Sequence, residues 1–513
     1  MTRARRITGI ALLPALALVA LLAWMFASPI GSSADDDFHL TSTWCANDWA
    51  GLCEEGAAAN RRVVPDELAW VDCFARHPEV SAACQDVLFA SETVEVSTKR
   101  GNWRGSYPPV YYAAMSVFAG PDIQVSALIM RFVTIVLFLG ITIALYLLLP
   151  PGRRPTLLWG WLITTLPLGI FLLASNNPSS WAIMGVGSAW LALLGYFETT
   201  GRRRVALGAV FAGSTVMAAG SRADSALYVG FAIFLVLLLT FERARAYLVR
   251  AVLPVAMGIV ALVLLIGASQ VASSAVGFSD GETAVPPIGS GTVEEGLTGA
   301  ALLAYNILNM PFLWSGVFGT WGLGWLDTSM PWIVPMAAIA VFVAVGFGGL
   351  GKKDVRTAIV VALTGVVLLV APLYVLQAGG DTVLEQVQPR YLLPLIVLLG
   401  GLLVLVPPGR VLTFGRIQAY TIAAALAVVN FIALHMNIRR YVTGVDDAGL
   451  NLDAGAEWWW AGFPVGPTAV WIIGAVAYGT LVFILVPRLA SGRVAEPGLV
   501  PELRLPRESS PAR

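Results

Sequence analysis

Long apolar runs separated by short polar loops dominate the chain. The runs are about 20 residues long and show no strict alternation of apolar and polar positions, which is typical of membrane helices. A long stretch between the first two runs, residues 29–124, is mostly polar. We therefore expect twelve membrane-spanning helices, at roughly 8–28, 125–149, 156–174, 180–197, 205–220, 225–241, 250–270, 331–349, 357–376, 391–407, 417–436 and 467–487.

Composition supports lipid as the solvent of this chain. Of its 513 residues, 57% are hydrophobic and only 12% are charged, and the mean hydropathy is +0.75. A water-soluble protein of this size could not bury so much apolar surface in a core. Because a backbone in lipid must satisfy its own hydrogen bonds, these runs are expected to be helices. The predicted fold class is an all-α polytopic membrane protein, whose partners include membrane lipids and exclude nucleic acid.

Basic residues give the predicted helices an orientation. Arg3, Arg5 and Arg6 precede the first helix and place the N-terminus in the cytoplasm by the positive-inside rule. With twelve spans, the C-terminus is cytoplasmic as well, and every second loop carries basic residues: Arg153 and Arg154, Arg202 to Arg204, Arg243, Arg245 and Arg250, Lys352, Lys353 and Arg356, and Arg410 and Arg416. Arginine is strongly preferred over lysine, which favours a bacterial source and hence a multi-pass protein of the bacterial plasma membrane.

The chain divides into six expected regions. Residues 1–28 hold the first helix, which resembles a signal peptide but is expected to be retained, because Ala27-Ser28-Pro29 is a poor cleavage site. The other regions are an extracytoplasmic loop over 29–124, helices two to seven over 125–270, a second extracytoplasmic loop over 271–330, helices eight to twelve over 331–487, and a disordered cytoplasmic tail over 488–513.

All four cysteines lie in the first extracytoplasmic loop: Cys45, Cys53, Cys73 and Cys84. An even number of cysteines in one exported segment suggests two disulfides. Pairing of Cys45 with Cys53 and of Cys73 with Cys84 is the simplest of three connectivities, among which the sequence cannot decide. Four free thiols are the alternative, and a zinc site is less expected because the spacings are wide.

Polar residues that are costly at a membrane edge gather on the predicted outer face. Ionisable groups there are candidates for function. They follow or precede six different helices: Asp35, Asp36, Asp37 and His39, Arg131, Asn176 and Asn177, Arg222 and Asp224, Asp327, and Arg390. Structural alternatives exist for several of them: Arg222 and Asp224 could pair only with each other, Arg131 could extend to the interface, and Asn176-Asn177 could cap a helix. The acidic run, taken alone, could be a solvated loop.

A short apolar stretch precedes the second predicted helix. It begins with Tyr107-Pro108-Pro109-Val110-Tyr111-Tyr112 and ends at Phe118, which is too short to cross a bilayer. We expect a re-entrant helix or a helix parallel to the interface, with proline at its start, where a missing N–H costs nothing.

Four motifs in order resemble domain-of-unknown-function family 2142, a group of bacterial polytopic membrane proteins. The family pattern D-E-x-x-H resembles Asp35-Asp36-x-x-His39, and Y-x-P-P-L-Y-Y resembles the run that ends Tyr107 to Tyr112. The pattern G-x-F-G-W-x-D resembles residues 319–327 with extra spacing, and Q-G-R-Y-x-x-P resembles residues 388–394 with proline at the glycine position. The resemblance covers roughly residues 10–440 and leaves the cysteine-bearing part of the first loop unexplained.

The family is similar in architecture to GT-C glycosyltransferases, and this resemblance implies a GT-C-like fold and a reaction. Such enzymes transfer a sugar from a polyprenyl-phosphate donor to an acceptor on the outer face. Here the acceptor would be an envelope polysaccharide or glycolipid. Asp35 or Asp36 would act as general base, with His39 orienting it or binding the acceptor, and a guanidinium would hold the lipid phosphate. The expected substrate-binding residues are Arg390, Arg222, Arg131, Asp224, Tyr107, Tyr391, Gln388 and Asp327.

Three alternatives compete with this interpretation. The adjacent acids could hold a divalent cation such as Mg²⁺ or Mn²⁺, although nothing else in the sequence indicates a metal site. A transporter or flippase of a lipid-linked saccharide would also use twelve spans and a polar site, but such proteins place charges near the bilayer midplane. A non-catalytic protein of envelope assembly is the third alternative.

Overall fold

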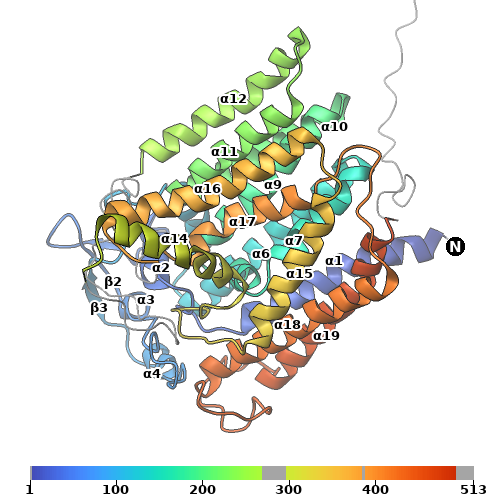
Figure 1. The fold of residues 1–513 in the computed structure, drawn as a ribbon. Coiled ribbons are helices and arrows are strands. Elements are labelled where there is room, and N and C mark those ends of the chain that lie inside the picture. The colour runs from blue at the N-terminus through green and yellow to red at the C-terminus, as the bar shows by residue number, and fades with distance from the viewer. Residues whose placement is uncertain (1–2, 269–295, 384–386, 493–513) are drawn as a thin grey trace, which may run out of the picture.

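A computed structural model describes residues 3–268, 296–383 and 387–492 of the chain (Figure 1). It is 67% helix and 3% strand, in agreement with a predicted helical membrane protein. The helices form one bundle, and the segment between the first two long helices folds into a small domain, here called the loop domain, at one end of that bundle.

Most of the helices lie in the bundle. They are α1 (Arg3–Phe26), α6 (Ile123–Leu148), α7 (Arg154–Thr164), α8 (Leu168–Leu173), α9 (Ser179–Glu198), α10 (Gly201–Ser221), α11 (Ala223–Thr240), α12 (Arg245–Ile266), α14 (Gly299–Ser315), α15 (Ile333–Leu350), α16 (Val355–Gly379), α17 (Pro389–Val404), α18 (Arg416–Val442) and α19 (Pro467–Ala490), with short 3₁₀ turns η2 (Pro151–Arg153) and η3 (Gly316–Phe318).

Among the described residues, 10 helices are long and apolar enough to cross a membrane. All of them except α14 coincide with predicted spans. The apolar part of α1, Leu12–Phe26, and the helix α17 are shorter. The continuous helix expected over 156–174 is instead two helices, α7 and α8, because the chain turns at Leu166-Pro167, and a proline inside a helix removes a backbone hydrogen bond.

Helix α14 was not expected, since residues 271–330 were predicted to form an outer loop. Its 20-residue apolar stretch, Gly299–Phe318, has a mean hydropathy of 1.3. At its start, the Gly299 carbonyl accepts a hydrogen bond from Gln377 Nε2 near the end of α16 (3.2 Å), and in its middle Asn306 Nδ2 donates to the Asp381 carbonyl just beyond α16 (3.0 Å). Near its end, Trp314 Nε1 donates to the Leu368 carbonyl in the middle of α16 (3.1 Å). Helix α14 therefore runs from one end of α16 to its middle.

The chain turns back after α14. The Phe318 ring contacts Phe342, in the middle of α15, at 5.1 Å between centroids. A few residues later, Trp325 Nε1 donates to the Gly31 carbonyl (2.8 Å), next to the loop domain. These contacts describe a re-entrant segment that enters the bundle and returns on the same side. The residues 269–295 of the expected outer loop lie outside the described part.

The basic loops lie together at the other end of the bundle, here called the basic face. Arg153 pairs with Glu198, and Lys353 Nζ donates to the Leu402 carbonyl (2.7 Å). The Phe414 amide donates to the Ala490 carbonyl (3.0 Å). Loops that were predicted to be cytoplasmic thus gather on one side, as the charge pattern requires. Cytoplasmic orientation of this face stays a prediction, and residues 493–513 of the expected tail lie outside the described residues.

The loop domain combines short helices with a small sheet. Its helices are α2 (Asp36–Cys45), α3 (Asp66–Ala69), α4 (Cys84–Ala90) and α5 (Val110–Met115), which is followed by η1 (Ser116–Phe118). Strands β1 (Glu54–Glu55), β2 (Arg62–Pro65) and β3 (Glu95–Thr98) form an antiparallel sheet in the order β1-β2-β3. This small sheet lies outside the bundle, and with 3% strand the structure is consistent with the predicted all-α class.

Close helix packing and side-chain caps hold the bundle together. At Gly185 in α9, an added Cβ would lie 2.7 Å from the Ala218 backbone nitrogen of α10, so only glycine permits this approach. Asp122 accepts from the Val125 amide at the start of α6. Such caps satisfy amides that have no partner inside their own helix.

Candidate functional site

The acidic run lies where α1 leaves the bundle and α2 begins. Asp35 precedes α2 with a left-handed backbone (φ 65°), a conformation that aspartate tolerates better than most residues. Asp36 Oδ2 accepts a hydrogen bond from the Ser33 amide (3.1 Å). Asp36 and Asp37 occupy the first turn of α2, where the helix dipole favours negative charge.

Asp35 joins two arginines from distant parts of the sequence. Its carboxylate forms ion pairs with Arg390 at the start of α17 and with Arg100 of the loop domain (3.1 Å). Arg390 also donates to the Ala34 carbonyl (2.6 Å). Burial alone would raise the pKa of Asp35, but the two guanidinium groups hold it well below its usual range. Asp35 is therefore an ionised carboxylate at neutral pH, with 31% of its side chain exposed.

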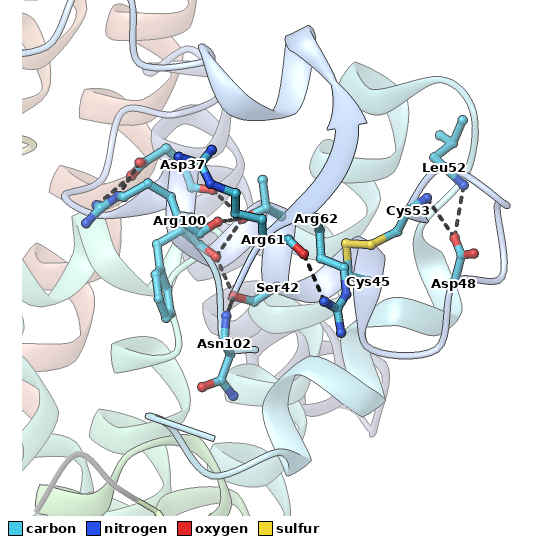
Figure 2. The surroundings of a disulfide bond; sticks show 12 residues. Asp37, Ser42, Cys45, Asp48, Leu52, Cys53, Arg61, Arg62, Arg100 and Asn102 are labelled. Atoms are coloured by element: carbon cyan, nitrogen blue, oxygen red, sulfur yellow. Dashed lines mark hydrogen bonds and ion pairs between the residues drawn. A yellow bond between two sulfur atoms is a disulfide. The ribbon is translucent and has the colours of Figure 1, made fainter. Parts of the chain in front are cut away.

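Arg100 was not predicted, and it links the acidic run to the loop domain. Its guanidinium binds Asp37 through two hydrogen bonds, from Nε (2.6 Å) and Nη2 (3.0 Å), as Figure 2 shows. Ser42 of α2 accepts from the Asn102 amide (2.9 Å), which fixes the segment that follows Arg100. The only sequence signal for Arg100 was its position shortly before the Tyr107 motif.

Asp36 lies in a different environment from its neighbour. Its side chain is fully buried, and its Oδ1 has no hydrogen-bond partner among the described residues. Burial raises its pKa to about 7, despite the opposing effects of Arg131 and the Ser33 amide. The surroundings therefore lower the pKa of the Asp35 carboxyl group and raise that of its neighbour Asp36.

His39 is buried one helical turn after Asp35. Its Nδ1 shares a hydrogen bond with the Tyr112 hydroxyl of α5 (2.9 Å), and its Nε2 has no partner among the described residues. Burial lowers the pKa of His39 well below its usual value, so the imidazole is neutral. The Tyr107 ring lies perpendicular to it at 5.3 Å between centroids. The Tyr107 motif, whose last residues begin the short α5 helix, therefore packs directly against the acidic run.

Two arginines lie over one tyrosine ring beside Asp35. The Tyr391 ring centroid is 4.6 Å from the Arg222 guanidinium carbon and 5.1 Å from that of Arg390. Arg222 is held by Asp224 at 2.8 Å, yet its Nη1 is buried without a partner among the described residues. Arg390 Nε is likewise buried without a hydrogen-bond partner among the described residues. Buried donors without acceptors are costly, which marks this pair as a candidate anion site.

A narrow cleft adjoins Arg390. Its lining comes from the acidic loop (Ser33 and Ala34), from α8, from the return segment after α14, and from Gln388 to Arg390. Its volume is about 20 Å³, room for about one water molecule. Gln388 and Arg390, both predicted to bind substrate, thus line one opening together with the backbone next to Asp35.

The Arg131 side chain stabilises the fold and does not face an open cleft. It is fully buried in α6 and donates to the carbonyls of Met25, Ser28 and Pro29 and to the Asn176 side chain. These bonds fix the chain where α1 ends. Asn177 donates in turn to Ser33 Oγ and the Ala34 carbonyl, each at 3.0 Å. The polar residues between α8 and α9 therefore support the acidic loop from behind.

Asp327 does not join the group around Arg390. It pairs with Arg440 of α18 (2.7 Å) and accepts from the Arg76 amide (3.1 Å). Arg440 also donates to the Phe74 carbonyl (2.8 Å). This buried pair fastens the loop domain to α18 and to the return segment after α14.

Both disulfides follow the local pairing. Cys45 is bonded to Cys53 and Cys73 to Cys84, and the first bond is drawn in Figure 2. The prediction of two disulfides is confirmed, and the two alternative connectivities are excluded. The first bond ties the end of α2 to the chain before the sheet, and the second ties the start of α4 to the α3 region.

The acidic run does not fit a divalent cation as it stands. In the described part of the chain, no group of three or more His, Cys, Asp or Glu side chains could hold a metal ion. The carboxylates of Asp35 and Asp37 are already bonded to Arg100 and Arg390. The guanidinium groups of Arg100 and Arg390 occupy the positions around these carboxylate oxygens where a metal ion would bind.

These features define a polytopic helical membrane protein with a buried charged cluster between its bundle and a disulfide-bonded loop domain. The sequence model of the family described as "Predicted membrane protein (DUF2142)" matches residues 18–399. The chain therefore belongs to this family. The match includes the acidic run, the Tyr107 motif, the return segment and Arg390. No curated protein and no solved structure matched the chain.

Proposed function

We propose that this protein is a GT-C-like glycosyltransferase that moves a sugar from a polyprenyl-phosphate donor to an envelope polysaccharide or glycolipid acceptor. The observation that carries this proposal is the ion pair between Asp35 and Arg390, which are 355 positions apart. A carboxylate and a guanidinium next to spare buried donors are the groups needed for proton transfer and for phosphate binding.

The transfer would proceed as one displacement. The acceptor hydroxyl oxygen attacks the anomeric carbon of the donor while the bond from that carbon to the phosphate oxygen breaks. Asp35 takes the hydroxyl proton. Arg390 and Arg222 hold the departing polyprenyl phosphate, and their N–H groups that lack partners (Arg390 Nε and Arg222 Nη1) are suited to its oxygens.

Asp35 is a better candidate for the base than Asp36. The Asp35 side chain is partly exposed, whereas Asp36 is fully buried and bonded to the Ser33 amide. Asp36 and His39 are then positioning residues that shape the loop. Donor phosphate would compete with Asp35 for Arg390, and a carboxylate released from one guanidinium is a stronger base.

The proposal is tested with the full-length protein in lipid nanodiscs and a panel of polyprenyl-phosphate monosaccharides that carry a radiolabelled sugar. Asp35→Asn is expected to lower the release of polyprenyl phosphate by at least about a hundredfold. Asp86→Asn changes an exposed aspartate of the loop domain and serves as the matched control.

Two outcomes would contradict the proposal. Full activity of Asp35→Asn would remove the base assignment. Movement of the intact lipid-linked sugar across the bilayer, without release of polyprenyl phosphate from any donor, would instead support the transporter alternative.

A further inference from the structure

A second cavity lies on the basic face, at the opposite end of the bundle from Asp35. Its volume is about 320 Å³, which is within the range of small-ligand sites. Its walls come from the C-terminal ends of α9 and α11, the N-terminal starts of α12 and α16, and the segment that follows α17. The candidate site described above uses none of these residues.

Some charges of this cavity are already satisfied. Arg153 binds Glu198 through Nη2 (2.6 Å) and Nε (3.0 Å), and its Nη1 donates to the Val406 carbonyl (2.6 Å). Asp354 accepts from the Thr357 amide (2.9 Å) and caps α16. The ion pair of Arg153 and Glu198 has little left to offer a ligand, whereas Asp354 keeps its negative charge at the cavity wall.

Three charged side chains remain available. Within the described residues, neither the Arg250 guanidinium nor the Glu242 carboxylate makes a hydrogen bond or ion pair. Arg356 donates from Nη1 to the carbonyls of Leu239 (3.4 Å) and Phe241 (3.2 Å), which leaves its Nε and Nη2 without an acceptor there. All three side chains line the cavity. They therefore offer two guanidinium groups and one carboxylate.

The surroundings of the cavity are apolar helix faces that look outward. Phe241 is 50% exposed, Leu248 67% and Val355 75%. They lie next to cavity residues at the C-terminal end of α11 and at the N-terminal starts of α12 and α16. At these positions the helices leave the hydrocarbon region of the membrane. A ligand here can therefore have a polar head in the cavity and acyl chains along these faces. Basic pockets between membrane helices on this side are suited to lipid headgroups.

We propose that this cavity binds a phospholipid headgroup that has a phosphodiester and a primary ammonium, the phosphatidylethanolamine class. Arg250 and Arg356 bind the phosphate oxygens, and Glu242 accepts from the ammonium. Two guanidinium groups beside two carboxylates, Glu242 and the capping Asp354, match this zwitterionic head better than a purely anionic one, which both carboxylates would repel. The bound lipid thus contacts the segment that follows α11 and the starts of α12 and α16 at the same time. This inference is independent of the proposed glycosyltransferase activity.

The test is native mass spectrometry of the full-length protein, titrated with phosphatidylethanolamine, phosphatidylglycerol or phosphatidylcholine of identical acyl chains. Phosphatidylethanolamine is expected to bind about tenfold more tightly than either of the others, since a charge-assisted hydrogen bond distinguishes each head. Free phosphoethanolamine is titrated in parallel and is expected not to compete, because it lacks the acyl chains.

Variants locate the binding. Arg250→Gln and Arg356→Gln are each expected to weaken phosphatidylethanolamine binding about tenfold, and Glu242→Gln to remove the preference over phosphatidylglycerol. Arg243→Gln is the matched control, because Arg243 is an exposed arginine of the same loop that does not line the cavity.

The proposal is overturned if the three lipids bind equally, or if the preference survives in all three cavity variants. Competition by free phosphoethanolamine at the affinity of the lipid would overturn the lipid as the occupant. Unchanged melting temperatures of the variants in detergent separate loss of binding from loss of folding.

Discussion

Asp35 and Asp36 are neighbours in the sequence, yet their carboxyl groups have opposite electrostatic surroundings. Two guanidinium groups stabilise the charge of Asp35, whereas Asp36 is buried with one oxygen that lacks a partner. The left-handed backbone at Asp35 lets consecutive side chains point to such different places. A residue pattern alone would treat the two as equivalent acids.

Asp36 makes stability depend on pH in a direction opposite to most aspartates. Its folded-state pKa is raised to about 7, above the unfolded value of 3.8. The folded state therefore holds a proton that the unfolded state loses, and stability falls as pH rises through this window, by about 2 kcal/mol between about pH 5 and pH 7. Thermal melting of the parent and of Asp36→Asn in detergent at these two pH values measures this loss.

The difference between the pH profiles of the parent and of Asp36→Asn isolates the contribution of Asp36 to stability. Asp72, whose pKa burial raises to about 7, and His39, whose pKa burial lowers well below its unfolded value, contribute to the pH dependence of both proteins alike. The parent should therefore lose more stability than Asp36→Asn as pH rises. Identical pH profiles would show that Asp36 is ionised in the folded protein throughout.

Arg131 and Arg222 are both buried arginines, but they should respond differently to lysine. Lysine cannot reach the four acceptors of Arg131, so Arg131→Lys is expected to destabilise the fold by roughly 3 kcal/mol. Arg222→Lys keeps a cation beside Asp224 and should fold, with weaker binding of the donor phosphate. Melting temperature and yield after purification measure the first effect. A stable Arg131→Lys protein with weakened donor binding would instead support the substrate-binding role expected for Arg131.

At the scale of elements, short helices surround the charged cluster. Helix α8 is one half of an interrupted helix, and α14 enters the bundle and returns, so backbone from both reaches the cleft beside Arg390. Non-helical backbone at this depth is tolerated where protein surrounds it. Long continuous helices could not place a loop such as 319–328 against the acidic run.

The return of the chain after α14 predicts that residues before α14 and residues after the return segment are accessible from one side of the membrane. Thr298→Cys and Trp332→Cys replace exposed residues at these two positions and should react in intact cells with a maleimide that cannot cross membranes. Lys352→Cys on the basic face is the control and should react only after permeabilisation. Labelling of Thr298→Cys and Trp332→Cys from opposite sides would show that α14 crosses.

At the scale of the whole molecule, the two ends of the bundle carry different chemistry. The loop-domain end gathers carboxylates and arginines in paired, buried contacts, and the other end gathers basic loops around a cavity. Helices between them have apolar outer faces, as on α12, where Leu248, Val252 and Val263 are largely exposed. This arrangement fits a protein that uses one surface of the bilayer for its site and anchors itself at the other.

Much of the site was predictable, because its members are polar residues at helix ends. Asp35, Arg390, Arg222 and Tyr391 come together as a common outer face would require. Arg100 was missed, since its only signal, a position shortly before the Tyr107 motif, does not indicate that it pairs with Asp37. Asp327 was expected at the site and pairs with Arg440 instead, because a shared face does not specify which charges meet.

The sequence by itself determined the lipid environment, most of the helices, the common side of the basic loops and the presence of two disulfides, though not their pairing. Each of these follows from a local rule: hydropathy over about 20 residues, charge beside a span, or thiols close together in an exported segment. Tertiary structure alone decided that α14 turns back, that the helix over 156–174 is broken, and that Asp35 is partly exposed while Asp36 is buried. These outcomes depend on pairings such as Arg100 with Asp37 and Arg131 with Asn176, whose energies arise only when distant segments meet.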